Sequence, residues 1–263
     1  MRKKIVGILV CMLLIITAIS ATGAMNVQTT WLVNENNYSQ QYQNNPANSP
    51  DIITIKIEGK VYEVNDPNNL LGGAIKVNDI IKGKYTYDSN AIDTDPDPKL
   101  GIYWYYSSPC GMEVKIGGLV FKTDLTNVRF GIGVQNNKIS PPYPGDAMEI
   151  GSGNNSNLSN GLTVDVIDWG LYDPSGTALS SDALPTTAPV LSDWNQSTYS
   201  LGLIIMGHNP SNLSMSYSIK ADVTKATKSK AKDVYFTTQP VLIWLLERFP
   251  NIFTIIRHLM GLY

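Results

Sequence analysis

LSMSYSIKADV, residues 213–223, is the stretch that decides the fold class. Apolar and polar residues alternate through the whole run, and a period of two is typical of a β-strand with one buried and one solvated face. We therefore expect one alternating set to face the core of a β-sheet. That set is Leu213, Met215, Tyr217, Ile219, Ala221 and Val223.

The same period occurs elsewhere in the chain, in IITIKIE (52–58) and NVRFGIGVQ (127–135). MEVKIGGLVFKT (112–123) predicts a hairpin, because Gly117 and Gly118 suit a two-residue turn that needs positive φ. Turn-rich pieces such as DPNN, SPPYPGD and GSGNNSN separate these runs, and no long helical period precedes Pro240. The pattern predicts an all-β body at residues 51–224, an antiparallel β-sandwich of jelly-roll-like type.

The N-terminus has the three parts of a secretory signal. Three basic residues, Arg2 to Lys4, precede an apolar run from Ile5 to Ile19, and small residues favour cleavage after Ala24. We expect a signal peptide with a helical apolar part at 1–24, then an extended lead-in at 25–50. An uncleaved anchor is the alternative, although the run is shorter than the roughly 20 apolar residues of a spanning helix. The protein is accordingly expected to be secreted and extracellular, associated with the cell envelope.

The charge and the cysteine content of the chain limit which partners and which disulfides are expected. The chain has 20 basic and 22 acidic residues, and the signal peptide carries three of the basic ones and no acid. An acidic mature chain argues against nucleic acid as a partner, because phosphate neutralisation needs a basic face. Cys110 is the one cysteine outside the signal peptide, so no intramolecular disulfide is expected. Glycosylation sequons, weak support for export, occur at Asn37, Asn154, Asn157, Asn195 and Asn212.

Catalytic chemistry is hard to build from these residues. The body contains one histidine, His208, and no His/Cys cluster that would hold zinc. Cys110 lacks a nucleophile signature, and a lone cysteine among apolar residues is usually buried and inert. We predict no catalytic activity and no resident cofactor. A glycoside-active enzyme remains an alternative, because the many acids allow a carboxylate pair that the sequence does not single out.

DTDPDP, residues 93–98, is the most distinctive acidic stretch. Hard oxygen ligands at alternate loop positions are able to wrap Ca²⁺, so calcium is the alternative cofactor. Proline stands where a calcium loop usually has glycine, and aspartates that cap the turns of a stiff connection explain the pattern equally well. The candidate ligands are Asp88, Asp93, Asp95 and Asp97.

Four consecutive aromatic residues, Tyr103, Trp104, Tyr105 and Tyr106, are the candidate ligand-binding residues. Exposed flat rings would form a platform for carbohydrate, which makes a glycan the alternative partner. If the run is a strand, alternate rings face opposite sides, so at most two rings line one surface. The commoner outcome is two rings in the core and two packed elsewhere.

Three stretches from Lys82 to Trp194 occur in an order that resembles a known domain: KGKYTYDSNAIDTDPDPKLGIYWY, then MEVKIGGLVF, then GTALSSDALPTTAPVLSDW. They are similar to an uncharacterised exported β-domain of bacterial and archaeal surface proteins, many of whose bacterial carriers have PEP-CTERM-type sorting tags. The resemblance implies export and a β-fold but no catalytic residues. This chain lacks the Pro-Glu-Pro signature of the tag, and its two ends look archaeal.

The C-terminus is apolar where the body is polar. A basic linker is expected at 225–239, followed by an amphipathic helix at 240–263 that is kinked at Pro250. The polar face of the helix argues against a spanning helix. Its apolar face would pack on the body, on a membrane surface or on another protein chain. The attachment residues are Leu242, Leu245, Phe249, Ile252, Ile256, Leu259 and Tyr263.

Together these patterns predict a structural or adhesion module of the cell envelope, attached through its C-terminal helix. The first alternative is a carbohydrate- or calcium-binding module, and the second is a glycoside-active enzyme.

Overall fold

The computed structural model describes residues 50–138, 144–194 and 202–229, and this part of the chain is almost entirely β-structure. Besides one short 3-10 helix, η1 (Leu191–Asp193), it contains ten strands. In chain order these are β1 (Ile52–Asn65), β2 (Ile80–Asp88), β3 (Leu100–Tyr105), β4 (Gly111–Ile116), β5 (Leu119–Lys122), β6 (Phe130–Lys138), β7 (Gly145–Ser152), β8 (Val166–Asp173), β9 (Leu203–Asn209) and β10 (Asn212–Lys228).

All ten strands belong to one antiparallel sheet with the order β3-β6-β7-β8-β9-β10-β1-β2-β4-β5. The predicted all-β, antiparallel class is therefore confirmed. The predicted hairpin is β4–β5, where Gly117 and Gly118 have φ of 55° and 84°. The predicted signal peptide, lead-in and C-terminal helix lie outside the described residues.

The sheet curls, and its longest strands, β10 and β1, show how. Their pairing shifts register between Glu58 and Gly59 and again between Val61 and Glu63. Such bulges bend a strand and increase its twist. A side chain at Gly59 would place its Cβ atom 2.1 Å from the carbonyl oxygen of Asp222 on β10. Glycine is required there, because the two backbones approach each other too closely for any other residue.

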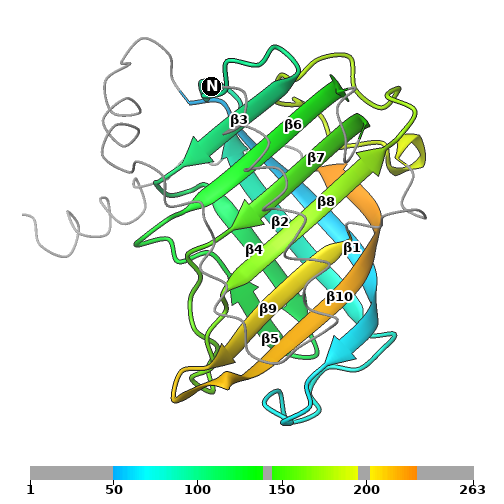
Figure 1. The fold of residues 1–263 in the computed structure, drawn as a ribbon. Helices are drawn as coiled ribbons and strands as arrows, with labels where there is room; N and C mark the ends of the chain where they lie inside the picture. The colour runs from blue at the N-terminus through cyan, green and yellow to red at the C-terminus, as the bar shows by residue number, and fades with distance from the viewer. Residues whose placement is uncertain (1–49, 139–143, 195–201, 230–263) are drawn as a thin grey trace, which may run out of the picture. The chain divides into compact units, whose positions relative to one another are not determined.

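The curl brings the two halves of the sheet face to face. Figure 1 shows β3, β6, β7 and β8 in front of β2 and β4, with β10 and β1 along the side. Tyr85 on β2 and Trp169 on β8 are far apart in the strand order, yet their ring centroids lie 5.8 Å apart. The hydroxyl of Tyr105 on β3 donates to the carbonyl oxygen of Asp88 on β2 at 3.0 Å. One core between the halves therefore holds the curled sheet together.

Two sequence expectations need correction at the ends of β10. Leu213 was expected in the core but is 66% exposed, because the β9–β10 hairpin extends past the core and the register shifts between Asn212 and Ser216. From Tyr217 to Val223 the predicted alternation is confirmed. The strand then continues to Lys228, so residues 225–228, expected in the linker, pair with β1 instead.

A buried hydroxyl offers a test of the core. The Tyr85 hydroxyl is buried and has no hydrogen-bond partner among the described residues, whereas the hydroxyl of Tyr87, on the same face of β2, donates to the carbonyl oxygen of Pro185. Burial raises the pKa of Tyr85 well above its ordinary value. We expect Tyr85→Phe to leave the free energy of unfolding unchanged or raise it by about 1 kcal/mol, because the orphan group is removed at constant shape.

Tyr87→Phe is the matched control for this prediction. It removes a hydrogen-bonded hydroxyl and strands the Pro185 carbonyl, so it should lower the free energy of unfolding by about 1 kcal/mol. Urea denaturation of both variants measures the difference. Equal losses in the two variants would contradict the environment described for Tyr85.

Candidate functional site

The outer face of the front half of the sheet carries the most unusual chemistry. Side chains that point away from the core on β3, β6, β7, β8 and β9 alternate with the buried set and form what we call the aromatic face. Its members are Ile102, Trp104, Gly131, Gly133, Glu149, Gly151, Asp168, Gly170 and Ile204.

The strand register arranges this face in two rows. In the first, Ile102 pairs with Gly133, which pairs with Glu149, which pairs with Gly170. In the second, Trp104 pairs with Gly131, which pairs with Gly151, which pairs with Asp168, which pairs with Ile204. Glycines therefore occupy the positions between Trp104 at one edge of the face and the acids Glu149 and Asp168.

Trp104 and Tyr106 form the aromatic edge. Their rings are stacked, with centroids 6.5 Å apart and planes inclined by 23°. The indole of Trp104 lies against Gly131, where an added Cβ atom would be 2.8 Å from the ring. Trp104 is half-buried, and Tyr106 is 42% exposed.

The alternation predicted for the four aromatic residues is confirmed, and only Trp104 and Tyr106 lie away from the core. Tyr103 and Tyr105 are 5% and 0% exposed because they face the core. The rings of Tyr103 and Tyr105 therefore do not belong to the aromatic face. Burial, with a smaller contribution from nearby carboxylates, raises the pKa of Tyr103 to about 12.

Glu149 and Asp168 are diagonal neighbours on β7 and β8, since Glu149 pairs with Gly170 and Asp168 with Gly151. Diagonal residues on one face have Cα atoms roughly 7–8 Å apart, within reach of long side chains. The residues opposite each acid in the adjacent strands are glycine or isoleucine, so they offer no side-chain donor. Burial raises the pKa of Asp168 to about 7, although a backbone hydrogen bond from Trp169 lowers it.

The two carboxyl groups influence each other. Burial, and then the charge of Asp168, raises the pKa of Glu149 well above its ordinary value. The Oδ1 atom of Asp168 is buried over Gly151 and finds no hydrogen-bond donor in the described ranges. Burial thus favours the protonated form of both carboxyl groups, and a protonated carboxyl group is able to donate as well as accept hydrogen bonds.

Asp173 lies on the same strand as Asp168 and shows how environment decides the outcome. It is buried, which raises its pKa, but hydrogen bonds from Ser175 and Thr177 outweigh burial and lower the pKa to about 2. Its partner across β7, Asp146, accepts hydrogen bonds from the backbone of Asn137 and Leu179. These two acids anchor loops, so we assign them a structural role.

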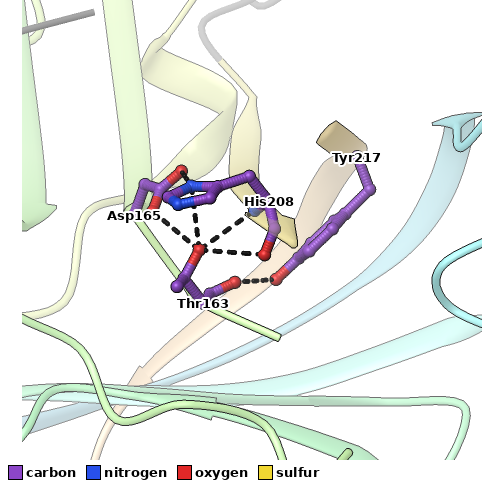
Figure 2. Close-up of polar contacts among 4 residues, drawn as sticks. All are labelled: Thr163, Asp165, His208 and Tyr217. Carbon is purple, nitrogen blue, oxygen red and sulfur yellow. Dashed lines mark hydrogen bonds and ion pairs between the residues drawn. The ribbon is translucent and has the colours of Figure 1, made fainter. Parts of the chain in front are cut away.

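A second polar cluster surrounds His208, near the start of β8 (Figure 2). Its Nδ1 atom lies 2.7 Å from Oδ2 of Asp165 and 2.9 Å from Oγ1 of Thr163, and the hydroxyl of Tyr217 donates to the Thr163 carbonyl oxygen at 2.7 Å. A catalytic triad needs the acid and the hydroxyl on opposite ring nitrogens. Here both share one nitrogen, so the cluster joins the segment before β8 to β9 and β10 rather than relaying a proton.

The acidic loop caps turns. Carboxylate oxygens of Asp93, Asp95 and Asp97 accept backbone N–H groups two residues further along the chain, and Asp88 does the same for Asn90. Asp97 also lies 3.7 Å from the Lys138 ammonium. Across the described ranges, no group of three or more His, Cys, Asp or Glu side chains converges as metal ligands. The structure thus does not gather the four predicted calcium ligands into one cluster.

Cys110 and the C-terminal attachment residues are the remaining residues that the sequence analysis singled out. Cys110 is buried, and burial raises the pKa of its thiol to about 11, as expected of an unreactive cysteine. The seven residues predicted for attachment, from Leu242 to Tyr263, lie outside the described residues. Within those residues the structure contains no helix of the length and apolar character needed to cross a bilayer.

Comparison with known proteins found no relative: no family model, curated protein or solved structure matches this chain.

Glu149 and Asp168, which we call the acid pair, were not predicted from the sequence. The signal that could have found it is a single acid within an apolar strand, as in AMEIG and VIDWG.

Proposed function

We propose that the chain is an exported, cell-envelope-associated adhesion module of β-sandwich type that binds carbohydrate on its aromatic face and has no catalytic activity. The observation that carries this proposal is the stacked pair of Trp104 and Tyr106, with the Trp104 indole lying against Gly131 and Asp168 Oδ1 lying over Gly151 on the same face. Flat aromatic rings provide apolar contact for the C–H face of a sugar ring, and a few polar groups fix its orientation.

The acid pair supplies those polar groups. Sugar hydroxyls both donate and accept, and a carboxyl group that keeps its proton does the same. Glu149 and Asp168 lie in the middle of the face, one row apart, so a sugar stacked on the aromatic edge would extend toward them. Export, and attachment through residues 240–263 to a membrane surface or another chain, are parts of the same proposal that rest on sequence patterns alone.

Glycan-array binding, followed by titration calorimetry with the best ligand, tests this function. Trp104→Ala and Tyr106→Ala should each weaken binding about tenfold or more, because aromatic anchors dominate such interfaces. Tyr62→Ala is a control, since Tyr62 is a partly exposed aromatic residue of β1 on the other half of the sheet. Unchanged affinity in both aromatic-edge variants would refute the glycan site.

The same experiment tests the absence of catalysis. Two carboxyl groups on one face are also the minimal equipment of a glycoside hydrolase. The bound glycan should therefore be analysed for cleavage after long incubation. Hydrolysis that Glu149→Gln abolishes would replace the adhesion assignment with an enzymatic one.

A further inference from the structure

The outer face of the other half of the sheet is dominated by lysine. We define the lysine face as five of the six exposed lysines on β1, β2, β4 and β5, the ones that lie in two adjacent rows: Lys56, Lys82, Lys84, Lys115 and Lys122. Strands are spaced about 4.8 Å apart, and alternate residues along a strand are roughly 6.8 Å apart. The five ammonium groups therefore occupy a small area of the sheet.

The register places like charges directly opposite each other. Lys56 pairs with Lys84 across β1 and β2, and Lys82 pairs with Lys115 across β2 and β4. On the other sides of these strands, Glu58 lies opposite Lys82, and Glu113 lies opposite both Lys84 and Lys122. Directly opposed like charges destabilise a sheet. Such an arrangement is consistent with a surface that binds an anionic partner, which would relieve the repulsion.

The acids on this face are already neutralised. Glu58 pairs with Lys225 of β10 at 3.4 Å, and Glu113 pairs with Lys115 at 3.1 Å. Within the described residues, Lys56, Lys82, Lys84 and Lys122 take part in no ion pair. The face thus keeps an excess of positive charge although the whole chain has a formal net charge of −2.

We propose that the lysine face docks on an anionic phospholipid membrane. The charges spread in two dimensions, over four strands and two rows, so a flat surface meets all of them at once, whereas a linear polyanion would meet mainly one row. Basic residues near an anionic bilayer contribute additively to binding. Because the two halves of the sheet pack face to face, docking by the lysine face leaves the aromatic face directed away from the membrane.

Vesicle co-sedimentation of the full chain tests this inference, with vesicles of phosphatidylcholine containing about one-third phosphatidylglycerol and with pure phosphatidylcholine vesicles. The test variant is Lys56→Gln/Lys84→Gln/Lys122→Gln. Each lysine contributes about fivefold to partitioning onto an anionic bilayer, so the triple variant should lose on the order of 100-fold. The matched control is Lys76→Gln/Lys99→Gln/Lys228→Gln, which makes the same change in net charge at exposed positions off this face.

The inference is supported if the test variant loses anionic-vesicle binding and the control retains most of it, with both variants unfolding at or above the wild-type midpoint. Equal partitioning of the two variants would overturn it, because membrane binding would then reside in another part of the chain. It would also be overturned if the lysine-dependent binding were to a soluble acidic polysaccharide and not to the vesicles.

Discussion

Asp168→Asn is expected to raise the free energy of unfolding at pH 8 by up to about 4 kcal/mol while changing it little at pH 4. The reason is the position of Asp168 on the aromatic face, where its Oδ1 atom is buried without a donor among the described residues. Ionising this carboxyl in the folded protein is unfavourable, whereas asparagine has the same shape and carries no charge. Denaturant unfolding at a series of pH values measures the effect.

The sign follows from proton binding. Burial raises the folded-state pKa of Asp168 to about 7 from an ordinary value of 3.8. Between these two values the folded protein binds more protons than the unfolded chain, so stability falls as pH rises through this window. Below pH 3.8 the carboxyl is protonated in both states and the penalty is absent. Above pH 7 the penalty is constant, and in this range Asp168→Asn raises the free energy of unfolding most.

Two further variants make the result specific. Glu149→Gln removes a neighbouring buried carboxyl group whose own ionisation is opposed first by burial and then by the charge of Asp168, so it should stabilise the protein in the same direction, and the double variant should gain less than the sum. Asp222→Asn changes an exposed carboxyl on β10 and should have no comparable pH dependence. If Asp168→Asn and Asp222→Asn show the same profile, Asp168 does not occupy the desolvated position described here.

The strands were predictable because each carries its own evidence. Ile53, Ile55 and Ile57 alternate with polar residues and are buried, and the Gly117–Gly118 turn forms the hairpin that its residue types require. Period two reports that one face is buried. It does not report what lies on the other side of the buried face, so it cannot distinguish two separate sheets from one sheet that folds over.

The curl depends on contacts between residues far apart in the sequence. Gly59 looks like any glycine in a strand, and only the approach of the Asp222 backbone explains it. The proximity of the two acids also depends on residues far apart in the sequence. Glu149 and Asp168 are nineteen positions apart, and they become neighbours because β7 and β8 pair in one particular register. By contrast, Asp93 and Asp95 cap turns through hydrogen bonds to residues two positions further along the chain. Turn capping was therefore one of the two interpretations that the sequence allowed.

Trp169→Ala is expected to lower the free energy of unfolding by about 3–5 kcal/mol, a large share of the 5–15 kcal/mol typical of a domain. Trp169 is fully buried on β8, and its ring packs against Tyr85 from β2, so its removal opens a cavity between the two halves of the sheet. Urea denaturation at pH 7 measures the loss. Tyr106→Ala, at an exposed position just after β3, should cost less than about 1 kcal/mol.

A double-mutant cycle between Trp169→Ala and Tyr85→Ala then tests the packing of the two halves directly. Residues in contact couple, and aromatic pairs contribute roughly 0.5–1.5 kcal/mol beyond the area they bury. A coupling energy of that size is expected because β2 and β8 are not neighbours in the sheet and meet only through the core. Additive losses would mean that Trp169 and Tyr85 do not touch. The curled sheet would then have to close in some other way, and the aromatic and lysine faces would lose their opposed directions.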